Sequence, residues 1–396
     1  MMNKLYKYYS LFLYLVILAG CRKTEFAEVP EPAYIRVFNC LERNITLENK
    51  DAPQPFLTML IDPVFDEQGI PISAEVVGDF LDTRDLWARP YPDAANTTIF
   101  QKEYPGAAKI VAAPFLNGYD LSSWAQITSG NRRFAFYSRP MNTVPFFSLD
   151  KGLRINKMLD TTVNLKREEV YTMHVMEKDF MKRENMLYVR NETFVKQPLS
   201  DSLVYVNFYN LSSDGYFENG PVRTNGSASF KLVDTTNVFL TLRRAPASAT
   251  GVTANQIVPG FNAKPFGQMI RNLEPKVNRY YSFPLYSDTS ANRIYPGLAV
   301  QLFEFLKPGY VIGTAAPIGN QNPDNTYLGL RVGPGLGSSG LDHLIGITAD
   351  VRSGLIITER SGIHNPRYFA TVNTVEYINA KIYLTTIQRK FDPPIY

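Results

Sequence analysis

Short runs of alternating apolar and polar residues recur along almost the whole chain from residue 33 onward. They are rich in Val, Ile, Tyr and Phe, and Gly, Pro, Asn and Asp separate them. Such alternation is typical of a half-buried strand, because successive side chains point to opposite faces of a sheet. Strands are predicted over 33–40, 56–61, 132–138, 170–176, 204–211, 238–243, 298–305 and 382–387. Only residues 157–168 come near helical spacing, so the pattern predicts an all-β fold of antiparallel β-sandwiches.

One of these runs occurs twice. Ala33–Cys40 has the order apolar, aromatic, apolar, polar, apolar, aromatic, Asn, apolar, and Val204–Leu211 repeats that order 171 residues later. A pleated strand with this order buries alternate apolar positions, and the final Asn favours a turn. The positions expected in the core are Ile35, Val37, Val206 and Phe208.

Two later pairs of segments also match in order. Arg132–Tyr137 resembles Val238–Arg243, and Val170–Met173 resembles Arg279–Ser282. Because self-similarity in a fixed order is typical of repeats, we predict two related β-sandwich domains, over residues 33–199 and 200–396. The second is long for one sandwich. Its residues 290–396 either add strands to it or form a further domain with a boundary near residue 290.

The first twenty residues have the parts of a secretory signal peptide. A basic start is followed by an apolar run over Leu11–Ala19, about half the ~20 residues that span a bilayer, and then by a small residue. The segment Leu18-Ala19-Gly20-Cys21 resembles the lipobox of bacterial lipoproteins, which implies cleavage after residue 20 and a lipid on Cys21. The Pro-containing, charged residues 21–32 then form a lipidated tether.

The strand order also carries a resemblance. An opening aromatic–Asn strand, a Phe-rich strand and a Tyr–Thr strand, over residues 33 to 290, resemble the uncharacterised immunoglobulin-like repeats of Bacteroidota envelope lipoproteins. The resemblance implies tandem immunoglobulin-like sandwiches at the outer membrane, and no assigned reaction. Arg22-Lys23-Thr24-Glu25 departs from the acidic residues that often follow the cysteine in exported members. The resemblance implies display at the cell surface, and this departure leaves retention on the periplasmic side as the alternative.

Charge and cysteine content narrow the function. Removal of residues 1–20 takes two Lys from the 41 Lys and Arg and leaves 39 against 37 Asp and Glu, so the mature net charge is +2. This near-neutral chain has no concentrated basic face, which excludes a nucleic-acid-binding protein. Once Cys21 carries lipid, only Cys40 remains, and its place in an apolar run predicts a buried, inert thiol.

The sequence assembles no catalytic or cofactor site. His174, His343 and His364 are scattered, and His174 is expected to pack within a strand. The glycines of 335–340 match a dinucleotide fingerprint, but no convincing helix follows them, so a hairpin loop is expected. Three carboxylates in Asp62–Gly69 could bind calcium, although they more often face water. We expect no enzyme, no cofactor and no resident metal ion.

Three aromatic residues are candidate contacts for a partner or ligand. Trp87 and Tyr91 lie in a Pro-rich loop, and Trp124 follows a polar segment. Trp and Tyr concentrate at binding surfaces, but either tryptophan could instead fill the end of a sandwich. The first hypothesis is a non-enzymatic protein-interaction or adhesion module of an outer-membrane assembly. The alternative is a carbohydrate-binding surface lipoprotein of a glycan-uptake system.

Lipidation gives the first testable prediction. Mass spectrometry of the membrane-extracted protein should show a mature chain that begins at an acylated Cys21. Cys21→Ser should release the chain from the membrane fraction, because multiple acyl chains are what hold such a protein stably. An unmodified thiol at position 21 in the membrane-bound protein would contradict this assignment.

Overall fold

The computed structural model divides the chain into two compact units, Met1–Pro30 and Glu31–Tyr396. The residues it describes are 29–41, 47, 53–84, 102–106, 108, 110–113, 115–200, 203–220, 223–225, 228–230, 233–243, 257, 259–284, 300–309, 327–333, 348–352, 368–379 and 381–390. Among these residues, no helix has the length and apolarity needed to cross a membrane.

The fold of the second unit is all-β, as the alternation predicts. The first half of the unit holds β1 (Pro32–Asn39), β2 (Leu57–Phe65), β3 (Pro71–Leu81), β4 (Glu103–Tyr104), β5 (Phe115–Leu116), β6 (Tyr119–Asp120), β7 (Ala125–Thr128), β8 (Gly130–Ser138), β9 (Lys157–Leu165), β10 (Val170–Asp179) and β11 (Glu184–Glu192). Three short 3-10 turns accompany them: η1 (Phe146–Ser148), η2 (Lys151–Leu153) and η3 (Phe194–Lys196). The 157–168 segment, with its near-helical spacing, is mostly strand β9.

The second half is built in the same way. It contains β12 (Leu203–Asn210), α2 (Tyr216–Asn219), β13 (Arg223–Asn225), β14 (Ala228–Phe230), β15 (Thr235–Arg243), β16 (Lys264–Ile270), β17 (Tyr281–Pro284), β18 (Val300–Leu306), β19 (Tyr327–Gly333), β20 (Thr348–Arg352), β21 (Tyr368–Ile378) and β22 (Lys381–Lys390).

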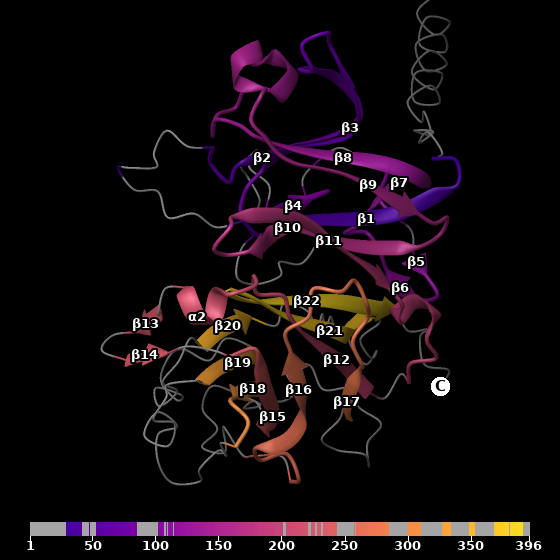
Figure 1. Ribbon diagram of the computed structural model, residues 1–396. Helices are drawn as coiled ribbons and strands as arrows, with labels where there is room; N and C mark the ends of the chain where they lie inside the picture. Colours follow the sequence, from indigo (N-terminus) through magenta and orange to yellow (C-terminus); the bar gives the residue numbers. More distant parts are fainter. Residues whose placement is uncertain are drawn as a thin grey trace, which may run out of the picture. The chain divides into compact units, whose positions relative to one another are not determined.

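Four of the sheets in the described chain form layers (Figure 1). The first outer sheet has the order β3-β2-β8-β9, and the first inner sheet has β11-β10-β1-β4 with β7 also on β1. The second inner sheet has the order β17-β12-β21-β22-β6-β5, and the second outer sheet has β16-β15-β18-β19-β20. Each inner sheet contains a parallel pair, β1 with β10 and β12 with β21, where purely antiparallel sandwiches were expected.

Both faces of the two inner sheets are buried, and the repeated sequence order explains how. In β1, Ile35 and Val37 pack against the first outer sheet, whereas Tyr34 and Phe38 point to the other face. In β12, the matching core positions face the second outer sheet, and Tyr205 and Tyr209 face back toward the first half. The predicted core positions are therefore confirmed. The alternating aromatic residues fill the interface between the two inner sheets.

The two repeated strands also end in the same way. Asn39 Oδ1 accepts a hydrogen bond from the Leu41 amide at 3.1 Å, and Asn210 Oδ1 accepts one from the Ser212 amide at 3.2 Å. Each Asn side chain also donates to a backbone carbonyl just ahead of the next long strand, at Pro55 and at Asp234. The Asn therefore closes a turn, as predicted, and also fixes the start of β2 or β15 from within the core.

The later sequence matches do not correspond to equivalent strands. Arg132–Tyr137 lies in β8, which is the third strand of the first outer sheet counted from β3. Val238–Arg243 lies in β15, which is the second strand of the second outer sheet counted from β16. Val170–Met173 lies in β10, whose counterpart by pairing is β21 and not the 279–282 segment. The predicted alignment was wrong because alternating strands resemble one another and the second half has much longer connections.

Residue 290, the possible further boundary, lies outside the described residues. Strands β18 and β21 lie beyond it, yet they pair with β15 and β12, so residues after 290 add strands to the second half. The hairpin of β5 and β6, from the first half, also extends the second inner sheet through β22. The halves therefore share one sheet as well as an interface.

Candidate functional site

A network of charged side chains lies buried between the two inner sheets. At its centre is Glu376 of β21, whose carboxylate is fully removed from solvent. Arg84 Nη1 donates to Glu376 Oε2 at 2.5 Å, and Arg190 Nη1 of β11 donates to Oε1 at 2.7 Å. His174 Nε2 of β10 lies 3.1 Å from Oε2, and Arg190 Nε also donates to Glu192 at 2.9 Å. One carboxylate is thus bound by three groups from the other half of the unit.

The charges of this network cancel when His174 is neutral, because two guanidiniums face two carboxylates. Burial lowers the pKa of His174, and the nearby charges of Arg84 and Arg190 lower it further. The Glu376 carboxylate raises this pKa, but by less than the other groups lower it. Burial alone would raise the pKa of Glu376, but His174, Arg84 and Arg190 hold it well below its usual value. The imidazole is therefore uncharged at neutral pH, and the central carboxylate is ionised.

Aromatic rings from both halves enclose the guanidiniums. Arg84 lies between Phe38 of β1, 3.9 Å from the ring centroid, and Tyr383 of β22, 4.4 Å from the centroid. Arg190 lies 4.4 Å from the centroid of Tyr209. A cation over an aromatic face is attracted to the ring quadrupole, most strongly when water is excluded. The network therefore stabilises the contact between the two halves.

Sequence reasoning found only one member of this network. It expected His174 to pack within a strand, and the structure places it fully buried. Glu376 and Arg190 were missed. Each is a charged residue inside an alternating apolar run, and that position was the signal in the sequence that could have identified them. Alternation alone cannot distinguish a charge that faces solvent from one that faces a second sheet.

Of the three aromatic residues predicted to contact a partner or ligand, only Trp124 lies in the described part of the chain. Trp124 is only 1% exposed and lies near Phe194, with the Arg36 guanidinium 5.3 Å from its ring centroid. It therefore cannot serve as an exposed contact. It is buried, as the alternative that it fills the end of a sandwich required, and it belongs to the cluster that also holds Tyr34 and Val372. Trp87 and Tyr91 lie outside the described residues, as does the lipidation site Cys21.

The other predicted features are placed as follows. Burial raises the pKa of the Cys40 thiol to about 12, so the predicted buried thiol is confirmed and is protonated at neutral pH. His343, His364 and the 335–340 glycines fall outside the described residues. No three His, Cys, Asp or Glu side chains within the described ranges are arranged to hold a metal ion.

The acidic loop proposed for calcium is a β-hairpin turn between β2 and β3. Asp66 Oδ1 accepts hydrogen bonds from the Gln68 and Ile70 amides, and Lys151 pairs with Oδ2 at 2.7 Å. Asp62 pairs with Arg132, also at 2.7 Å. Two of the three carboxylates are therefore used by the fold, which favours the structural interpretation over calcium binding.

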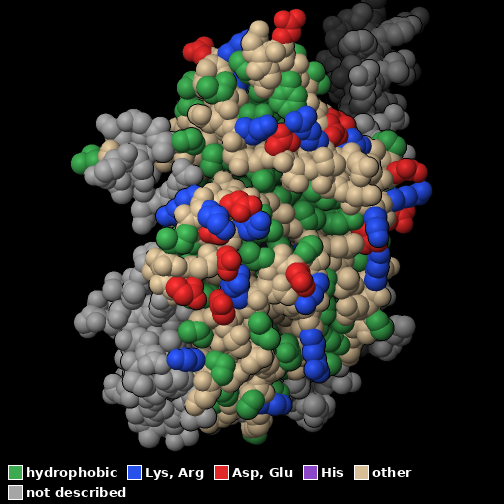
Figure 2. Space-filling model, viewed as in Figure 1, with side chains coloured by type: hydrophobic (Ala, Val, Ile, Leu, Met, Phe, Trp, Pro, Cys, Tyr) green, Lys and Arg blue, Asp and Glu red, His purple; other side chains and the backbone are tan. Residues whose placement is uncertain are grey.

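Exposed apolar side chains occur both on this hairpin and on the β8–β9 connection. Arg154 Nη1 donates to the Pro71 carbonyl at 3.0 Å and, with the Lys151–Asp66 pair, holds the β8–β9 connection against the hairpin. Green side chains are visible at this end of the unit, at the top of Figure 2. We call the following residues the apolar end: Val64, Ile72, Met141, Val144, Leu153 and Ile155. Grouped exposed apolar residues mark interaction surfaces more often than scattered ones do.

No family model matches this chain, and no curated protein matches it. Its function therefore has to be inferred from its own residues.

Removal of the central charge should destabilise the unit strongly. Glu376→Gln leaves Arg84 and Arg190 buried without their shared counter-charge, and loss of one partner of a buried pair costs about 3–5 kcal/mol. The matched control is Glu184→Gln, which removes an exposed carboxylate 2.9 Å from Lys178 and should cost less than about 1 kcal/mol. Urea unfolding of both variants measures this difference. Equal, small losses would contradict the central role of Glu376.

Proposed function

We propose that this chain is a non-enzymatic lipoprotein that is anchored to the outer membrane by lipid on Cys21 and binds another envelope protein. Its β-sheets project from the tether and face the cell exterior. Support for the anchor comes from the basic start, the short apolar run and Leu18-Ala19-Gly20-Cys21. Support for an envelope role comes from the resemblance to the immunoglobulin-like repeats of Bacteroidota lipoproteins.

The observation that carries the binding role is the apolar end. Ile155 is 57% exposed, Ile72 47% and Leu153 40%, and the Arg154–Pro71 hydrogen bond ties the segments that carry them together. This surface lies on the rim of a small core in which Phe146 and Leu149 pack on the outer face of the first outer sheet. A firmly held apolar surface suits a protein partner, since little conformational entropy is lost when it binds.

The placement of reactive groups supports a role without catalysis. The described thiol, imidazole and interior carboxylates lie inside the fold, where Glu376 and His174 are bound to each other and to arginines. Catalysis needs such groups within reach of a substrate in a cleft. Here they hold the two inner sheets together.

The test uses the natively lipidated protein, extracted from outer membranes in mild detergent. The wild type should recover an outer-membrane protein in stoichiometric amount. Leu153→Glu with Ile155→Glu should reduce that recovery at least about tenfold, because each apolar side chain buried at an interface contributes about 1.5–3 kcal/mol. The control is Met181→Glu, which charges an apolar residue that is even more exposed (65%), in the β10–β11 turn.

Because the substituted side chains face solvent, all three proteins should unfold at similar temperatures. Loss of partner in the double variant but not in Met181→Glu would support the proposal. Recovery of the wild-type lipoprotein alone, or equal recovery by all three proteins, would contradict it.

A further inference from the structure

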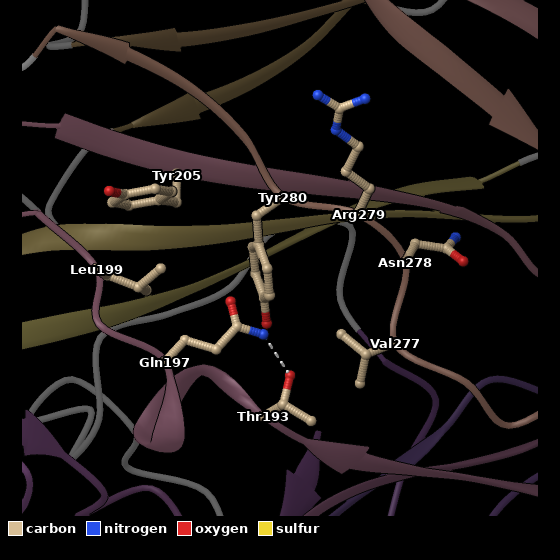
Figure 3. Close-up of a pocket in the computed structure, with 8 residues that line it drawn as sticks. All are labelled: Thr193, Gln197, Leu199, Tyr205, Val277, Asn278, Arg279 and Tyr280. Carbon is tan, nitrogen blue, oxygen red and sulfur yellow. Dashed lines mark hydrogen bonds between the residues drawn. The ribbon is translucent and has the colours of Figure 1, made fainter.

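A second candidate site lies away from the apolar end, where the two halves of the chain are joined. A pocket of about 550 Å³ opens between the connection from β11 to β12 and the loop that precedes β17 (Figure 3). This volume falls in the range of small-molecule sites. Its lining consists of Thr193, Gln197, Leu199, Tyr205, Val277, Asn278, Arg279 and Tyr280.

Two tyrosines give the pocket its aromatic surface. Tyr205 comes from β12, and the Ser200 amide donates to its hydroxyl at 2.7 Å, which holds the ring in place. Tyr280 points inward, with its hydroxyl toward Gln197 and Thr193 (Figure 3). That hydroxyl is buried, and the Thr193 side chain lies within hydrogen-bond reach of it. A hydroxyl can donate one hydrogen bond and accept others, so a ligand could bond it beside Thr193.

The Gln197 amide lies beside this hydroxyl, whereas the Asn278 side chain points away from it (Figure 3). Gln197 Nε2 donates to Thr193 Oγ1 at 2.9 Å, which leaves the amide oxygen of Gln197 as an acceptor. Asn278 Nδ2 donates to the Phe208 carbonyl at 2.7 Å, so this amide is held in the same way. Both side chains are thus oriented by the protein before any ligand arrives. Their oxygens accept, whereas the Tyr280 hydroxyl can both donate and accept.

The charge of the lining narrows the class of ligand. Among the described residues, no carboxylate lines the pocket, and Arg279 is the one charged residue of the lining. The Arg279 guanidinium lies 5.5 Å from the Tyr281 ring centroid and extends away from Gln197 (Figure 3). A cationic ligand would therefore find no counter-charge in the lining. A neutral ligand rich in hydroxyl groups matches the fixed acceptors and the Tyr280 hydroxyl.

We propose that this pocket binds one sugar ring of a neutral glycan. The apolar C–H face of such a ring can lie on a tyrosine ring, while its hydroxyls donate to the amide oxygens and bond the Tyr280 hydroxyl. The site is separate from the apolar end, so it stands whether or not the protein partner proposed above exists. In this proposal the aromatic residues that bind carbohydrate are Tyr205 and Tyr280, and not Trp124.

The test is electrophoresis of the mature lipidated protein, in mild detergent, through native gels that contain soluble starch, galactomannan, xylan or polygalacturonate. At least one of the three neutral polysaccharides should retard the wild type. Tyr280→Phe keeps the ring and removes only the hydroxyl, so retardation on that polysaccharide should weaken about tenfold without loss of stability. Gln197→Ala should weaken it to a similar extent.

The matched control is Gln268→Ala on β16, which also removes an amide side chain with one hydrogen bond, here to Asn237 at 3.2 Å. Its retardation should equal that of the wild type. Weakening in both pocket variants but not in the control supports the proposal. No retardation on any neutral polysaccharide, retardation by polygalacturonate alone, or equal retardation of all four proteins would overturn it. The proposal would also be overturned if the wild type bound no polysaccharide but carried a bound peptide or protein that the pocket variants had lost.

Discussion

A carboxylate removed from water needs both counter-charge and hydrogen bonds, and Glu376 takes all of them from the other half of the unit. Arg84 lies 292 positions away in sequence, just after β3, and Arg190 lies on β11. If the inner sheets separated, these ions would have to be solvated again together, and the rings over Arg84 would part. The network therefore fixes one arrangement of the inner sheets, which a purely apolar interface would specify less strictly.

The same interface explains an otherwise redundant feature of the repeated strand. A sandwich needs one apolar row on each strand, but Ala33–Cys40 and Val204–Leu211 carry a second, aromatic row. The first row fills the core of each half, and the second fills the space between halves. Each inner sheet is thus buried on both faces, and the hairpin of β5 and β6 joins the sheet of the opposite half. The binding surfaces that we propose lie outside this interface.

Local pattern predicted the all-β class, the core positions of β1 and β12, the Asn turns and the burial of Cys40, because each depends on neighbours within a few residues. It did not predict which distant strands pair. The paired residues of β10 and β1 lie 136 positions apart (Val170 with Tyr34), and alternation carries no information about a partner at that range. It also missed Glu376, because a charge on an alternating strand normally faces solvent. Trp124 was ambiguous in sequence, since a tryptophan suits either a surface or a core.

If the buried network makes the two halves one cooperative unit, both must unfold in a single transition. The chain has two tryptophans, Trp87 and Trp124, both in the first half of the sequence. Trp124 is buried, so its fluorescence reports unfolding around it in the first half, whereas far-ultraviolet circular dichroism reports the strands of both halves. Urea unfolding of the mature chain followed by both signals should give superimposable curves. Two separate midpoints in the wild-type protein would contradict the account.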